Sequence, residues 1–462
     1  MSADHLSALH CRGPAWDIVL QNLSLSSLKN LRLTSKTLAA ACNHHRFLRF
    51  IENQTTDLST QSLQSLATLA AHPLGRGVKH LTLLAAVYDK SWLERIVQTK
   101  LIPQNSSSGM IQLTTSSVAT EEQISQYINE LEWLKEKKKE LEEASDDSIT
   151  DSLVAILQKF EVLNCLKLEA TVILRQGRKQ GSTTTNFRDW RMGWEHAART
   201  FRITMRALVR SKATVEKLTV LRDTKRCGVA PRHIAAQVQG LQAGDLKGIK
   251  EFALCIGIGS VAEENEHHAA AADLIGAMPN LEALDVQFFM AHRIDSEREL
   301  SESIFGSIAS EAHLPCLQRC RLRGVRTRQD TLVELITSRP NIRDLELDEL
   351  DLHDSPDVGE VLQALIKSLP SLTRARLSNL WGAKGLMNLN PRGGSRALEE
   401  NRKGWSVRCT VGGDMVHTIV LEGDELKADI KFRPAPGGRM LGSLRQHKWR
   451  ALREAEYAIY TS

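Results

Sequence analysis

Residues 331–350 constrain the fold most, because the spacing of their apolar residues changes halfway along the segment. In the first half, the apolar residues have the i, i+3, i+4 spacing of a helix with one buried face; they are Leu332, Leu335 and Ile336. Pro340 ends this helix. Beyond it, Leu345 and Leu347 alternate with acidic residues, which is the period of a strand buried on one side. The segment therefore predicts a helix, a turn and a strand.

One such unit leaves an apolar stripe on its helix and an apolar row on its strand, so it needs copies of itself alongside. Similar segments end in strands whose second apolar residues are Val220, Leu254, Val286, Leu322, Leu347 and Leu377. Subtracting successive positions gives spacings of 34, 32, 36, 25 and 30 residues. Earlier copies have the strand pairs Leu81/Leu83 and Leu166/Leu168. Spacing of this kind predicts a repeat with irregular insertions.

The polar residues of these strands support the same alignment. In parallel strands held in register, the residue before each second leucine lies beside its counterpart in the next unit. Those residues are Asp285, Arg321, Glu346 and Arg376. The row two positions earlier reads Arg319, Asp344 and Arg374. Because a shift of one residue would bury these charges, the alternation of sign predicts neighbouring strands with an open, charged face.

Composition and length favour a folded protein of more than one domain. The chain has 462 residues, of which 42% are hydrophobic and 25% charged, and its net charge of +5 is small for this length. Eight cysteines fall mostly within apolar patterns, which indicates core residues in a reducing compartment. We see neither a signal peptide nor an apolar run long enough for a membrane span. We therefore expect an intracellular protein of the cytoplasm, the nucleus or both, with no membrane partner.

The first fifty residues predict three short amphipathic helices: one beginning near Pro14, a second capped by Ser26, and a third beginning at Ser35. Residues 23–42 resemble the F-box, particularly in the pattern Leu28-x-x-Leu31-Arg32-Leu33-x-Ser35-Lys36. The resemblance implies a hook that docks onto a Skp-family adaptor and so joins an SCF-type ubiquitin ligase. The expected adaptor-binding residues are Pro14, Leu20, Leu23, Leu28, Leu31 and Leu33.

The order of the following motifs resembles F-box proteins with irregular leucine-rich repeats, a group abundant in filamentous fungi. The resemblance rests on the F-box-like segment, a helix that ends at His72-Pro73, and the strand with Leu81 and Leu83. It implies an α/β solenoid with a parallel sheet and outer helices. We divide the chain into an F-box-like segment (11–50), a solenoid (51–390) with an insertion at about 103–150, and a linker, small β meander and tail (391–462).

The helix expected at 187–210 separates aromatic from basic residues. Its apolar side carries Trp190, Trp194, Ala197, Phe201, Met205 and Leu208. Its other side carries Arg188, Arg191, Arg199, Arg202, Arg206 and Arg210. The aromatic residues have core spacing and do not suggest base stacking, so we expect no nucleic-acid partner. The arginine side is either a solvated outer face or a site for an acidic partner or phosphate.

One motif points to an enzyme. Gly257-x-Gly259-x-x-Ala262 follows an apolar strand and precedes a predicted helix, as in a dinucleotide-binding turn. Against this interpretation, Glu263, Glu264 and Glu266 would place negative charge at the helix start where a pyrophosphate binds. The cysteine and histidine patterns, such as His313-x-x-Cys316-x-x-x-Cys320, lack a fourth metal ligand.

We therefore expect a receptor that is not an enzyme, without catalytic residues, cofactor or metal. The expected partner is a protein substrate of unknown identity. The expected partner surface consists of Arg188, Arg191, Arg199, Arg202, Arg206, Arg321, Glu346 and Arg376. Two alternatives remain open. One is a leucine-rich-repeat scaffold uncoupled from ubiquitination, because the opening Leu-Pro of the F-box would align near Cys11 and Arg12. The other is a nucleotide-dependent enzyme that uses the glycine turn.

Overall fold

The structure is a computed structural model in which most residues between 51 and 426 are described. The described ranges are 18, 22–36, 38, 51–104, 115–160, 162–175, 178–181, 190–224, 227–242, 244–259, 264–290, 295–355, 357–383, 385–389, 406–410, 413–426 and 433–434.

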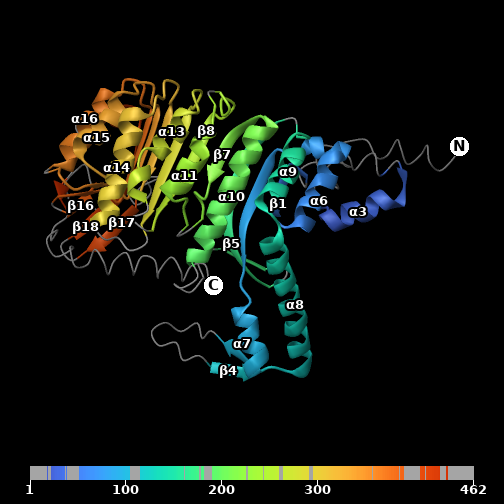
Figure 1. The fold of residues 1–462 in the computed structure, drawn as a ribbon. Helices are drawn as coiled ribbons and strands as arrows, with labels where there is room; N and C mark the ends of the chain where they lie inside the picture. The colour runs from blue at the N-terminus through green and yellow to red at the C-terminus, as the bar shows by residue number, and fades with distance from the viewer. Residues whose placement is uncertain are drawn as a thin grey trace.

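A large, mostly parallel sheet runs the length of the molecule (Figure 1). Within the described residues, nine strands lie side by side in chain order and parallel to one another. They are β1 (Asn53–Asp57), β2 (His80–Tyr88), β5 (Leu163–Arg175), β7 (Val215–Val220), β8 (Glu251–Ile258), β9 (Ala283–Met290), β10 (Arg319–Arg323), β12 (Asp344–Asp348) and β14 (Arg374–Ser378). β18 (Gly413–Glu422) and β17 (Ser406–Thr410) then extend the sheet in antiparallel order. β6 (Arg178–Gly181) pairs with β5 away from this path.

Helices form a layer over one face of this sheet (Figure 1), and each contacts the next in chain order. They are α6 (Thr60–Ala71), α9 (Asp146–Leu157), α10 (Trp190–Ser211), α11 (Pro231–Val238), α13 (Ala270–Gly276), α14 (Asp295–Glu311), α15 (Gln329–Thr337) and α16 (Val358–Ser368). The residues predicted to face inward from α15 are buried: Leu332, Leu335 and Ile336. The predicted α/β class, with a parallel sheet and outer helices, is confirmed.

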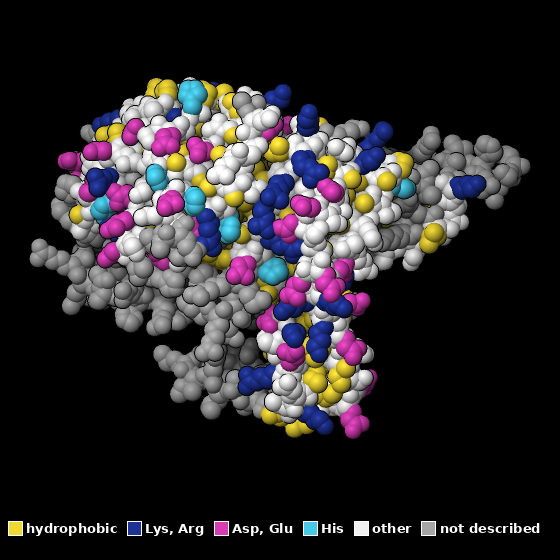
Figure 2. All heavy atoms as spheres, in the orientation of Figure 1, with side chains coloured by type: hydrophobic (Ala, Val, Ile, Leu, Met, Phe, Trp, Pro, Cys, Tyr) yellow, Lys and Arg dark blue, Asp and Glu magenta, His cyan; other side chains and the backbone are white. Residues whose placement is uncertain are grey.

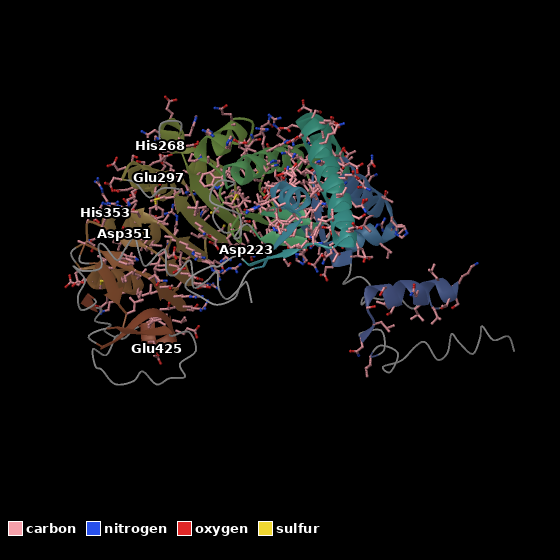
Figure 3. All side chains as sticks on the ribbon, turned by 90° about the horizontal axis from the view of Figure 1, so that it is seen from below. Asp223, His268, Glu297, Asp351, His353 and Glu425 are labelled. Atoms are coloured by element: carbon pink, nitrogen blue, oxygen red, sulfur yellow. The ribbon has the colours of Figure 1, made fainter. Side chains whose placement is uncertain are left out.

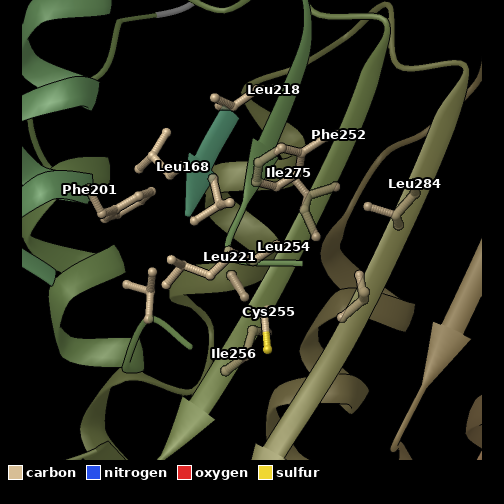
Figure 4. Packing of buried hydrophobic residues seen from close by; sticks show 14 of the residues in the cluster. Leu168, Phe201, Leu218, Leu221, Phe252, Leu254, Cys255, Ile256, Ile275 and Leu284 are labelled. Carbon is tan, nitrogen blue, oxygen red and sulfur yellow. The ribbon is translucent and has the colours of Figure 1, made fainter. Parts of the chain in front are cut away.

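A continuous row of apolar side chains lies between the sheet and the helices. The strands align Leu83, Leu168, Val220, Leu254, Val286, Leu322, Leu347 and Leu377 in one register. All are at most 1% exposed. Figure 4 shows the central part of this core, where Phe201 of α10 faces the strands. Because burial of a Leu or Val side chain stabilises by about 1.5–3 kcal/mol, this row is a major source of stability. The register predicted from the sequence is confirmed.

The later strands end in a recurring bend. The residue after β7, β10, β12 and β14 has a positive φ in each case; these residues are Leu221, Gly324, Glu349 and Asn379. At Gly324 only glycine fits, because a Cβ would lie 2.7 Å from the carbonyl oxygen of Phe288. Past the bend, β11 (Arg326–Thr327), β13 (Asp351–Leu352) and β15 (Trp381–Gly382) pair in parallel as part of a second, narrow sheet. The sequence did not predict this second sheet.

A projection, here called the finger, separates β2 from α9 (Figure 1). It contains α7 (Ser91–Thr99), the two-stranded sheet of β3 (Leu101–Gln104) and β4 (Thr115–Val118), and the long helix α8 (Glu121–Glu143). α8 begins with a reciprocal capping box between Thr120 and Gln123, and at 1.5 Å per residue its 23 residues span about 35 Å. The finger overlaps the interruption predicted between residues 103 and 150, but it begins earlier, with α7 at Ser91.

The N-terminal segment required a correction, and the C-terminal meander is described only in part. In the N-terminal segment, α3 (Leu25–Thr34) is capped by Ser24, whose hydroxyl accepts a hydrogen bond from Ser27 N at 3.2 Å, and not by Ser26 as expected. In the C-terminal meander, β17 and β18 form the expected hairpin. A third strand of the meander is predicted at 426–432, and of these residues only Leu426 is described, at the end of the 3-10 turn Gly423–Leu426. Residues 427–432 lie outside the described part of the chain. No described helix is long and apolar enough to span a membrane.

Candidate protein-binding surfaces

The face of the sheet opposite the helices is charged, and its side chains are paired across strands. The middle row joins Asp285, Arg321, Glu346 and Arg376 on adjacent strands. The first row joins Arg319, Asp344 and Arg374, and the third places Arg323 beside Asp348. The strand order and the alternation of charge predicted from the sequence are therefore confirmed. We call the outward side chains of β10, β12 and β14 the charged face.

Contacts within the charged face are long and involve single nitrogen atoms. Glu346 lies between two guanidinium groups, 3.2 Å from Arg321 Nε and 3.6 Å from Arg376 Nη1. Arg323 Nε lies 3.4 Å from Asp348, and Arg374 Nη1 lies 3.5 Å from Asp344. Since nitrogen–oxygen hydrogen bonds peak near 2.9 Å, the contacts of Arg321 and Arg376 with Glu346 leave much of the donor capacity of these two guanidinium groups unused.

The rows continue beyond the charged face with closer pairs. Arg222 Nε lies 2.6 Å from Asp285, and Lys217 Nζ lies 2.9 Å from Glu251, which also contacts Arg319. Burial alone would raise the pKa of Glu251, but hydrogen bonds from Lys217 and Arg319 hold it below its ordinary value. The charged side chains on the strands before β10 are therefore already paired with one another.

The arginine side of α10 meets carboxylates of the neighbouring helix. Arg199 Nε lies 2.7 Å from Asp146 Oδ1, and Arg202 contacts the other oxygen of the same carboxylate. Further along, Arg210 lies 2.6 Å from Asp151, and Arg206 lies 3.8 Å from Asp147. Figure 2 shows the dark-blue side chains gathered over α10 with acidic groups next to them. The side chains of Arg188 and Arg191 lie outside the described residues.

Arg199 also closes the end of the finger helix. Its two terminal nitrogens donate to the carbonyl oxygens of Leu141 at 2.7 Å and Ala144 at 2.6 Å, where α8 ends. Burial acts to raise the pKa of Asp146, but hydrogen bonds from Arg199 and Arg202 lower it overall. The guanidinium of Arg199 therefore joins the last turn of α8 to the first turn of α9. We call this group of residues the helix junction.

A second arginine fixes the finger along its length. Arg175, at the end of β5, forms a bidentate pair with Glu130 of α8, with nitrogen–oxygen distances of 2.6 and 2.8 Å. Its guanidinium also lies over the rings of Tyr127 and Trp92, 5.2 and 5.8 Å from their centroids. Sequence reasoning missed this site because 45 residues separate the two charges and neither belongs to a local pattern.

Exposed apolar side chains occur on the finger and on the N-terminal segment. Val118 and Leu101 of the finger are 75% and 39% exposed, and Figure 2 shows apolar side chains among the charges at its outer end. In α3, Leu28 is buried, Leu23 and Leu31 are partly buried, and Leu33 is 85% exposed. Pro14 and Leu20 lie outside the described residues.

The glycine turn at Gly257 is filled by a tryptophan. A Cβ on Gly257 would lie 2.9 Å from the Trp194 ring, and one on Gly259 would lie 3.1 Å from it. Trp194 in turn packs edge-to-face against Phe289, with ring centroids 5.8 Å apart. These glycines therefore make room for an aromatic side chain of α10.

Of the three glutamates expected at the start of the following helix, Glu264 and Glu266 are described, and Glu263 lies outside the described residues. α13 begins only at Ala270, after the 3-10 turn Asn265–His267. The buried carboxylate of Glu264 accepts a hydrogen bond from Arg232 N at 2.8 Å, at the first turn of α11. Burial raises its pKa above the ordinary value. Glu264 is itself helical, and its carboxylate is used at the first turn of α11.

The cysteine and histidine patterns do not converge on a site in the described part of the chain. Cys316 is exposed and Cys320 is buried. In Figure 3, Asp223 and Glu425 lie well away from His268, Glu297 and His353. Among the described residues, no group of three or more histidine, cysteine or acidic side chains is placed to hold a metal ion.

Comparison with protein-family models and with curated protein sequences finds no match to this chain. Its candidate surfaces therefore rest on their own geometry: the charged face, the exposed leucine of α3, and the outer end of the finger.

Proposed function

We propose that this protein is a substrate-receptor subunit of an SCF-type ubiquitin ligase. Its N-terminal helices would dock a Skp-family adaptor, and the charged face of its leucine-rich-repeat-like arc would bind a protein substrate. The observation that carries the proposal is the division of leucines in α3. Leu28 is buried, whereas Leu33 projects into solvent with 85% of its surface exposed. A single exposed leucine is ordinary on a protein surface, so its weight here comes from its place in the F-box-like pattern Leu28-x-x-Leu31-Arg32-Leu33.

Adaptor binding is tested by co-purification of the full chain with Skp-family proteins. Because Leu28 is buried, its replacement by Asp would unfold the segment, so Leu33→Asp is the sharper variant. We expect the wild-type chain to capture an adaptor and Leu33→Asp to lose it with an unchanged circular dichroism melt. Thr34→Asp, which adds the same charge at the adjacent exposed position, is the matched control. Failure of the wild-type chain to bind any Skp-family adaptor would remove the ligase role.

The second candidate is a scaffold that binds proteins without coupling them to a ligase. It is favoured by the absence of Leu-Pro at Cys11 and Arg12, where the F-box pattern begins. The same co-purification separates it from the first proposal, since a scaffold would keep its substrate but bring down no adaptor. The Trp194 ring over Gly257 and Gly259 argues against a nucleotide-dependent enzyme, because it fills the space above the turn.

A further inference from the structure

On the charged face, arginines outnumber acidic residues and lie on both sides of them. Its nine outward positions carry five arginines on the two outer strands, three acids on the central strand, and Ser378. Adjacent strands lie about 4.8 Å apart, so the two arginine strands are roughly 10 Å apart with the acids between them. The face therefore has a central strand of carboxylates, β12, with guanidinium groups on the strands at either side.

Side-chain length places the guanidinium groups outermost. In the middle row, the side chains of Arg321 and Arg376 are 38% and 43% exposed, whereas that of Glu346 is 17% exposed. A partner that approaches the sheet thus meets the two arginines before the glutamate. The carboxylate of Glu346 is shared by both arginines, and Asp285, the next acid of this row, is already paired with Arg222 at 2.6 Å.

These two guanidinium groups also keep unused donors. Among the described residues, neither Arg321 nor Arg376 donates a hydrogen bond, and their only interactions are the two long contacts with Glu346. Arg376 Nε has no hydrogen-bond partner but is inaccessible to solvent, so the donors that a partner can reach are the terminal nitrogens. By contrast, Arg319 and Arg374 have further anions at Glu251 and Glu422. A carboxylate from a partner would therefore form its most favourable interactions with the two arginines of the middle row.

We propose that the charged face binds an extended acidic segment of the protein substrate, with Asp or Glu at alternate positions. This inference rests on the function proposed above. Alternate residues of an extended chain lie about 6.6 Å apart, which is also the distance between successive rows along a strand. A segment lying along β12 would place successive carboxylates between Arg319 and Arg374, between Arg321 and Arg376, and beside Arg323. Arginine suits this role because its fork of donors matches a carboxylate.

The test uses the full chain and a fluorescein-labelled peptide with three Glu residues at alternate positions, measured by fluorescence anisotropy at low salt. Arg321→Gln with Arg376→Gln should weaken binding about tenfold or more. The matched control, Arg206→Gln with Arg210→Gln, removes the same charge from exposed side chains of α10 and should change binding less than about twofold. Equal losses in the two double variants would overturn the proposal, since only net charge would then matter.

A second variant reverses the expected direction. Glu346→Gln removes the carboxylate that competes with the ligand, so binding should tighten by about threefold or more. Asp151→Asn, which changes the net charge equally on α9, should have little effect. Weaker binding by Glu346→Gln would contradict the proposed site. So would selective binding of a phosphorylated peptide or a single-stranded RNA in place of the glutamate peptide.

Adaptor capture by the Arg321→Gln, Arg376→Gln variant keeps the two proposals separable. The variant should retain any Skp-family adaptor that the wild-type chain binds, because the charged face is distant in sequence and structure from α3 (Figure 1). If the wild-type chain binds the peptide but no adaptor, the ligase role fails and the acidic-segment site stands.

Discussion

Arginine meets carboxylate both at the helix junction and on the charged face, but the contacts differ in kind. At the junction, Arg199 donates to two carbonyl oxygens and one carboxylate at 2.6–2.7 Å. On the face, Arg321 and Arg376 share Glu346 at 3.2 and 3.6 Å without a hydrogen bond among the described residues. The first arrangement uses up its donors and holds helices together. The second leaves donors available for a partner.

The largest effect should come from Arg199→Met, which keeps an apolar stem and removes the guanidinium. We expect the free energy of unfolding to fall by about 2–4 kcal/mol, because two carbonyl groups lose their donor and Asp146 loses one of its two. Urea denaturation at pH 7 measures the change. Arg210→Met, whose side chain is 54% exposed, should cost about 0.5 kcal/mol or less. Similar losses of stability in both variants would show that Arg199 holds the helices together no more strongly than an exposed arginine does.

Arg175→Met should act next most strongly, and locally. Loss of the bidentate pair with Glu130 and of the contacts with Tyr127 and Trp92 should cost about 1–3 kcal/mol. We expect faster amide hydrogen exchange in α7 and α8 and unchanged exchange in α10. Arg95→Met on α7 is the exposed control. Uniform acceleration throughout the molecule would mean that the finger is not a separate unit of stability.

The junction should also give the protein a dependence on acid. Because the pKa of Asp146 is lower in the folded state than in the unfolded state, its contribution is fully present above about pH 4. It is lost as the pH falls through the folded value. Asp146→Asn should therefore reduce stability at pH 6 and narrow its gap from the wild type towards pH 3, as measured by urea denaturation. A constant gap from pH 6 to pH 3 would contradict this assignment.

The smallest effect is expected on the charged face. A double-mutant cycle of Arg321→Gln and Glu346→Gln should give a coupling energy of about 0.5 kcal/mol or less, because the contact is long and partly exposed. Thermal denaturation of the four proteins measures it. A coupling as strong as that between Arg199 and Asp146 would show that the face is built for stability, which would weaken its case as a binding surface.

Much of the fold followed from the sequence because two independent patterns agreed. The leucines of the strands set which side is buried, and the alternating charges of Asp285, Arg321, Glu346 and Arg376 set which strands are neighbours. A strand has a period of two residues, so a wrong register would have violated both patterns together. The helix-facing and solvent-facing sides of the sheet were predictable for this reason.

The remaining features depend on contacts that have no local signature. The partners of Arg175 and Arg199 are 45 and 53 residues away, and a charge at that distance looks like any solvated charge in the sequence. Gly257 and Gly259 have the spacing of a phosphate-binding turn, but a tryptophan from another helix determines their role. The second sheet was missed because β11, β13 and β15 each contain only two residues.

The bend after each of the later strands has a consequence for how this molecule can change. The chain turns at the same point of each unit, at Leu221, Gly324, Glu349 and Asn379. Backbone hydrogen bonds such as Gly324 N to Asp348 O hold neighbouring turns in register. The frame is thus fixed by main-chain geometry, while residues 321, 346 and 376 contribute little to it. We therefore expect substitutions at these three positions to change the charge pattern of the open face while the backbone frame is kept.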